Sequence, residues 1–162
     1  MRRNIYLIGS LVILGSCGSD ETGKPKISYR NIRFSFTLQL PPRCQVVESP
    51  TGDSVRLSMP EMPGLSVFVY GCRNAWGLEN VNDLKRLTEN IGPNPLPTFR
   101  FIALGEMPGI EFDDSKVGEL LVPRHRTYLN GNTLYGFCLE SSSPTGQRAL
   151  EFLDQICESL RT

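Results

Sequence analysis

Residues 124–140 of the chain read RHRTYLNGNTLYGFCLE, and they carry the clearest structural signal in the sequence. Asn130-Gly131 stands between two runs that are rich in strand-forming residues. Asn-Gly is a strong signal for a tight β-hairpin, because both positions tolerate the positive φ of a type I′ turn. The sequence therefore predicts an antiparallel hairpin made of residues 124–129 and 133–140.

Further strand patterns lie outside this hairpin. Residues 32–40 alternate apolar and polar side chains, which predicts a strand with one buried face that ends at Pro41-Pro42. Residues 65–70 are almost continuously apolar, which predicts a central strand. Other strands are expected at residues 45–48, 54–59, 99–104 and 116–122, with a brief extension at 110–113.

Two segments change to helical spacing. Apolar residues recur every three or four positions over residues 81–91, and Gly92-Pro93 follows them. Residues 147–160 show a second apolar stripe of this kind. These patterns predict an α+β domain, in which two helices pack on a mainly antiparallel sheet of about seven or eight strands.

Composition excludes some classes of protein. The 162 residues carry 17 basic and 17 acidic side chains and one His, so the formal net charge is zero. A protein without an excess of positive charge is not expected to bind nucleic acid. No G-x-S-x-G, H-E-x-x-H, P-loop or G-x-G-x-x-G motif is present, and no cofactor is expected.

Residues 1–16 have the features of a bacterial export signal. Arg2 and Arg3 precede an apolar run that is too short to span a bilayer, where about 20 residues are needed. Leu14-Gly15-Ser16-Cys17 resembles the lipobox of bacterial lipoproteins. This resemblance implies cleavage before Cys17 and attachment of acyl chains such as palmitate to that residue. An ordinary cleaved signal, with a coincidental Cys17, is the alternative.

The lipobox resemblance sets the expected organisation and location. Residues 1–16 are expected to be the signal peptide, residues 17–30 a lipid-anchored flexible tether, and residues 31–162 one α+β domain. Gly18 takes the place of the Asp that commonly retains lipoproteins at the inner membrane, which favours the outer membrane, facing the periplasm. The membrane is thus an expected partner through the N-terminal lipid.

The four other cysteines are expected to form disulfides. An even number of cysteines in a small exported domain favours two bridges. Of the three possible pairings, Cys44–Cys72 and Cys138–Cys157 are favoured because they close short loops. Buried thiols are the alternative. A metal centre is disfavoured, because there is no C-x-x-C and no Cys/His cluster with ligand spacing.

Several polar residues are candidates for catalysis, metal binding or a charged surface. His125 lies between two arginines and is interpreted as an exposed strand residue, not a catalytic base. Glu111, Asp113 and Asp114, with Glu119 beyond them, form the densest acidic cluster, which a Ca²⁺ ion could use, although a solvated turn is favoured. The arginines and lysine of the neighbouring predicted strands could form a basic strip: Arg100, Lys116, Arg124 and Arg126.

The only Trp of the chain lies in a loop of small residues after the predicted central strand. Arg73, Asn74 and Trp76 belong to this loop. Tryptophan is enriched in binding hot spots, and loops carry function more often than cores do. These three residues are therefore the candidates for contact with a partner, and a Trp that caps the end of the sheet is the alternative.

The order of elements resembles that of the PsbP-like (Mog/PsbP) α/β/α sandwich, including the DcrB-type lipoproteins. The resemblance rests on Phe34-Ser35-Phe36 with Pro41, the helix around residues 83–87, the Asn-Gly hairpin, and Phe152-Leu153-x-x-Ile156 in the last helix. It implies a binding, assembly or chaperone-like domain without catalysis.

The leading hypothesis is therefore a non-catalytic, lipid-anchored binding domain of the cell envelope that acts through a protein partner. A sharper version is an immunity-type inhibitor of a secreted toxin. The alternatives are an assembly factor for an envelope complex and a metal-dependent hydrolase that uses Glu111, Asp113 or Asp114.

Overall fold

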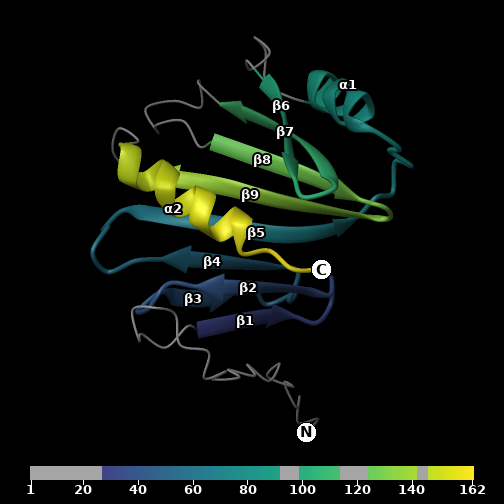
Figure 1. The fold of residues 1–162 in the computed structure, drawn as a ribbon. Coiled ribbons are helices and arrows are strands. Elements are labelled where there is room, and N and C mark those ends of the chain that lie inside the picture. Colours follow the sequence, from purple (N-terminus) through teal and green to yellow (C-terminus); the bar gives the residue numbers. More distant parts are fainter. Residues whose placement is uncertain (1–26, 92–98, 114–123, 142–145) are drawn as a thin grey trace, which may run out of the picture.

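The structure is a computed structural model that describes residues 27–91, 99–113, 124–141 and 146–162 (Figure 1). The N-terminal half holds β1 (Ile27–Asn31), β2 (Phe36–Leu40), β3 (Gln45–Glu48), β4 (Ser54–Ser58), β5 (Leu65–Arg73) and α1 (Val81–Ile91). The C-terminal half holds β6 (Phe99–Leu104), β7 (Met107–Asp113), β8 (Arg124–Asn130), β9 (Thr133–Ser141) and α2 (Gln147–Glu158).

Seven of these strands form one antiparallel sheet in the order β3-β4-β5-β9-β8-β7-β6, and β1 and β2 form a separate two-stranded sheet. The centre is the pair of nine-residue strands β5 and β9, which pair over their whole length. The predicted α+β class, with two helices on a mainly antiparallel sheet, is confirmed.

The predicted hairpin is confirmed, but its turn lies one residue later than expected. Asn130 pairs with Thr133, so Gly131 and Asn132 are the two loop residues. Gly131 has a φ of +54°. A glycine at the first central position is the signature of a type II′ turn, because only that position needs positive φ. The predicted type I′ turn at Asn130-Gly131 was therefore wrong.

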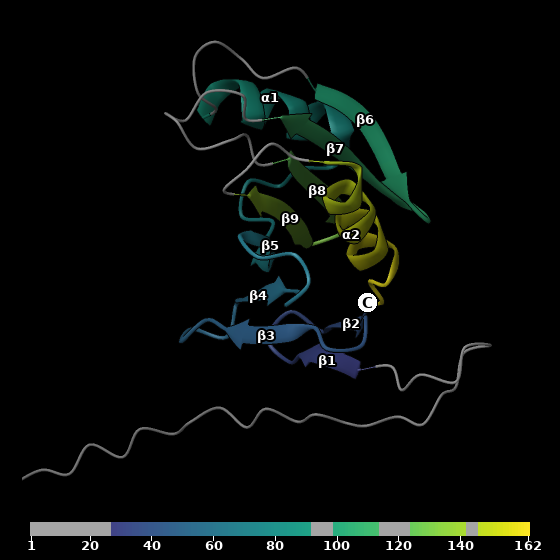
Figure 2. The same cartoon turned by 90° about the vertical axis from the view of Figure 1, so that its left-hand side faces the viewer.

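The two faces of the large sheet carry unequal cores. Alternate residues of the central strands, such as Val69 and Phe137, face α2 and join the main core with Leu153 and Ile156. The opposite face carries α1 and a small core of four buried residues, namely Leu84, Ile110, Leu129 and Leu134. Figure 2 shows the sheet nearly edge-on, with α2 against one side of β8 and β9.

The domain starts earlier than predicted. Residues 27–30 were assigned to the flexible tether, but they form most of β1, where Tyr29 is buried in the main core. The predicted strand 32–40 begins only at Phe36, since residues 32–35 form a turn. The Oδ1 atom of buried Asn31 accepts a hydrogen bond from the Phe34 amide at 2.9 Å, which stabilises that turn.

Some predictions fall on parts of the chain that the structure does not describe. These are the signal peptide (1–16), most of the tether (17–26) and the strand predicted at 116–122. Within the described ranges, neither helix has the length and apolar character needed to cross a membrane.

Candidate functional site

The connection between β5 and α1 places Trp76 at the surface. The Trp76 side chain is 59% exposed, which is unusual for the largest apolar side chain. Arg73, the last residue of β5, is exposed beside it. Trp76 is therefore accessible to a partner, although its side chain also lies beside Tyr70 and Cys72 of the sheet, as the alternative of a cap at the end of the sheet expects.

Hydrogen bonds from Asn74 hold this loop in one conformation. Its side-chain amide donates to the Leu78 carbonyl at 2.7 Å and to the Gly131 carbonyl at 3.2 Å, and its Oδ1 accepts from the Leu78 amide at 2.9 Å. The backbone N–H of Asn74 also donates to the Asn132 carbonyl at 2.8 Å. Asn74 is thus a positioning residue that fastens the loop to the β8–β9 turn.

A reciprocal cap begins α1 directly after the loop. Asn80 Oδ1 accepts from the amides of Asn82 and Asp83, and Asp83 Oδ2 accepts from the amides of Glu79 and Asn80. This exchange satisfies backbone donors that a helix start leaves open. The loop is therefore fixed at both of its ends, by the sheet and by the helix.

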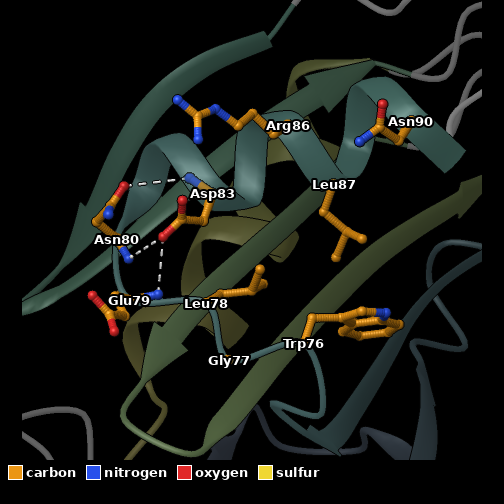
Figure 3. Close-up of a pocket in the computed structure, with 9 residues that line it drawn as sticks. All are labelled: Trp76, Gly77, Leu78, Glu79, Asn80, Asp83, Arg86, Leu87 and Asn90. Carbon is orange, nitrogen blue, oxygen red and sulfur yellow. Dashed lines mark hydrogen bonds between the residues drawn. The ribbon is translucent and has the colours of Figure 1, made fainter.

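An open groove of about 460 Å³ lies between the loop and α1. In Figure 3 the Trp76 ring forms one wall, and the Leu87 side chain points from α1 towards it. Arg86 and Asn90 line the helix side. The groove thus offers an aromatic surface with polar groups at its rim, which is the composition of a protein-binding patch.

Three of the predicted basic residues meet at one carboxylate. Glu111 on β7 is 3% exposed, and Arg100 Nε and Arg126 Nε donate to its two oxygens at 2.6 and 2.5 Å. Arg124 Nε lies 3.8 Å from Glu111 Oε1. Arg126 also reaches Asp154 of α2 at 2.6 Å. Three residues of the predicted strip therefore form a charge network around one buried carboxylate, which connects β6, β7, β8 and α2.

This network argues against both interpretations of Glu111: the favoured solvated turn is wrong for this residue, which is buried within β7, and a metal ligand is disfavoured as well. Both carboxylate oxygens are bound by guanidinium groups, which repel a cation. No group of three or more potential ligands for a metal ion occurs within the described ranges. The other positions considered with Glu111 are not described: Asp114 and Glu119 lie outside the described residues, as does Lys116, and the side chain of Asp113 is not described.

His125 is half-buried, not exposed as predicted. Its ring stacks on Phe112 with centroids 4.9 Å apart, and its Nε2 lies 3.5 Å from Cys138 Sγ. His125 and Cys138 are direct partners in the β8–β9 register. The sequence did not predict this Cys–His contact, because a turn centred on Asn130-Gly131 would pair His125 with Gly136 and not with Cys138.

Neither predicted disulfide is present among the four described cysteines. Cys157 belongs to the core under α2, whereas Cys138 shares the opposite face of the sheet with Phe68, its register partner. Cys44 and Cys72 are also separated, because Cys44 belongs to the main core and Cys72 packs against the small core. The sheet therefore stands between the members of each predicted pair, and both pairings were wrong.

Burial raises the pKa of three of these thiols. The pKa of Cys44 is raised to about 11 and that of Cys157 to about 12, and the pKa of Cys72 is also raised. Thiolates are the nucleophilic form of cysteine, so these three groups are protonated and inert at neutral pH. Cys17 lies outside the described residues.

No family model and no curated protein sequence matches the chain. Its fold is similar to the solution structure of cyanobacterial PsbP (CyanoP) from Synechocystis sp. PCC 6803, with a TM-score of 0.57 and 13% identity over 91% of this chain and 98% of that chain. A protein from Bacteroides thetaiotaomicron VPI-5482 is similar with a TM-score of 0.51 and 12% identity, over 78% of this chain but 44% of that one. The predicted PsbP-like fold is therefore confirmed, and identities this low show the fold alone.

Proposed function

We propose that the chain is a non-catalytic binding domain, held in the bacterial envelope by a lipid on Cys17, that grips a protein partner with the Trp76 loop. The single observation that carries this proposal is the exposed Trp76 on a loop braced by Asn74. A fixed aromatic side chain loses little conformational entropy on binding, and tryptophan is the residue type most enriched among binding hot spots.

The finer proposal is an immunity-type inhibitor, in which the loop occludes the active site of a secreted toxin. Such a role needs a rigid protruding group and no catalysis of its own. The PsbP-like fold supports an interaction domain without catalysis, and an envelope assembly factor is the competing version of this proposal.

Site-specific photocrosslinking tests the binding surface. A photoreactive amino acid at position 76 of the full chain, expressed in its bacterial host, should capture one protein in stoichiometric yield. A second probe at Phe101, which is 56% exposed on edge strand β6, is the matched control and should not capture that protein. Equal capture from both positions would disprove the assignment of the surface.

The identity of the captured protein then separates the two finer proposals. A toxin whose activity is suppressed by the chain, but not by its Trp76→Ala variant, supports immunity. A resident envelope protein, together with a defect in its complex after deletion, supports assembly. Incorporation of an alkyne-labelled palmitate that is lost in Cys17→Ala tests the anchor separately, and labelling that persists would refute it.

A further inference from the structure

A second hollow opens beside the groove, between α1 and the sheet. It encloses about 320 Å³, within the range of small-molecule sites. Its sheet wall includes Tyr70 and Cys72 of β5 and Thr127 of β8, its helix wall includes Leu87 and Thr88, and Trp76 stands where it meets the groove.

The hollow exists because α1 covers only part of its face of the sheet. The helix packs chiefly on β7, and the core beneath it has four buried residues. Over the central strands the space is kept open by Gly136. A Cβ at that position would lie 2.0 Å from Cζ of Tyr70, so the Tyr70 ring lies against the bare backbone of β9 and does not fill the hollow.

The chemistry of the walls selects an uncharged ligand. Among the residues that the structure describes, none that lines the hollow is charged. Its polar groups already have internal partners, since Thr88 Oγ1 donates to the Leu84 carbonyl at 3.0 Å and Thr127 interacts with the Tyr70 hydroxyl. An ionised ligand would lose its hydration there without gaining a countercharge, which disfavours its binding. An apolar ligand would gain from leaving water and meets aromatic rings on two sides.

We propose that this hollow is a binding site for an uncharged, apolar small molecule with one or two aromatic ring systems, which enters past Trp76. The site lies on the α1 face of the sheet and needs no protein partner. It therefore goes beyond the proposed function, and either can fail without the other.

Fluorescence titration with N-phenyl-1-naphthylamine, an uncharged dye with two aromatic ring systems (naphthyl and phenyl), tests the site. The full chain is used as its Cys17→Ala variant, so that no attached lipid at that position takes up the dye. The dye should bind at one molecule per chain and quench Trp76, the only Trp, by energy transfer. The anionic 8-anilinonaphthalene-1-sulfonate should bind at least about tenfold more weakly, which is the measure of charge exclusion.

Two variants that narrow the hollow from opposite walls locate the dye. Thr88→Met places a larger side chain, which is also a better helix former, on the helix wall, and Cys72→Leu places a larger side chain on the sheet wall. Each should weaken binding of the dye by about tenfold or more. Asn82→Met, on an exposed position of the same helix, is the matched control and should leave it unchanged. Circular dichroism verifies that each variant is folded.

Three results would overturn the proposal. The first is that the uncharged dye shows no saturable binding, and the second is that the anionic dye binds as tightly as the uncharged dye. The third is that a folded narrowing variant binds the uncharged dye as tightly as the control variant does. If only one narrowing variant is folded, that variant alone decides the outcome.

Discussion

Glu111 is almost completely removed from solvent, and the Nε of Arg126 donates a hydrogen bond to its Oε2 at 2.5 Å. The Arg126 side chain is itself only 13% exposed. Removing one member of a buried pair typically costs about 3–5 kcal/mol, and of its described ion pairs Arg126 would keep the one with Asp154, whose side chain is 48% exposed. We therefore expect Glu111→Gln to lower the free energy of unfolding by about that amount in urea denaturation.

The half-exposed pair of Arg56 and Glu140 provides the control for this prediction. Their atoms lie 3.0 Å apart, but the side chains are 55% and 39% exposed. Exposed ion pairs contribute about 0–1 kcal/mol. Glu140→Gln should therefore lower the free energy of unfolding by about 1 kcal/mol or less, and a loss equal to that of Glu111→Gln would contradict the structural role of the network.

Asn74 should control the mobility of Trp76 through its hydrogen bonds to the loop. Asn74→Ala removes three side-chain hydrogen bonds that fasten the loop to Leu78 and Gly131. We expect the fluorescence anisotropy of Trp76 to fall and the yield of the partner crosslink to drop, because the loop loses its preorganisation. Asn132→Ala is the control, since Asn132 reaches Asn74 through its backbone carbonyl. Unchanged anisotropy in Asn74→Ala would show that the loop is held by other contacts.

The sequence predicted the fold well because its signals are local. The hairpin, the central strand and both helices follow from periodicity and turn residues over a few positions. The turn at residues 32–35 was missed because Phe34 and Phe36 continue an alternating pattern across it, while the Asn31 side chain redirects the chain. The only signal for this turn in the sequence was Asn31, which lies three residues before Phe34 and whose side chain can accept a hydrogen bond from the Phe34 amide.

The site was less predictable because it depends on register and on which face a residue takes. Trp76 could be selected as an exposed candidate, but the bracing role of Asn74 requires that β5 end beside the β8–β9 turn. The disulfides failed for the same reason. Short spacing along the chain brought the cysteines together in sequence, whereas the period of two along β9 placed Cys138 on the face away from Cys157.

The separation of the cysteines by the sheet leads to a prediction about their redox state. The Cys17→Ala chain, unfolded in guanidinium without reductant, should release four reactive thiols towards Ellman's reagent. Before unfolding, the reaction should be slow, because burial raises the pKa of Cys44, Cys72 and Cys157 and keeps them protonated. Detection of no thiols after unfolding would mean that the pairs do form and that the strands are arranged differently.

Alkaline pH should weaken the fold through groups whose native pKa is raised by burial. The pKa of Cys157 is raised from 9.0 to about 12, that of Cys44 from 9.0 to about 11, and that of Tyr29 from 10.0 to about 12. Above pH 9 the unfolded chain releases these protons while the native chain keeps them, so the unfolded state binds fewer protons and stability falls as the pH rises towards 12.

Each such group contributes a slope of at most about 1.4 kcal/mol per pH unit. Urea denaturation from pH 7 to pH 11 should therefore show constant stability to about pH 9 and a decline above it. Cys157→Ala will be less stable at neutral pH because it leaves a small cavity, but its decline with pH should be shallower by the slope of one group. A slope identical to that of the unmodified chain would show that Cys157 ionises as readily in the native state as in the unfolded chain, and that the core under α2 admits water.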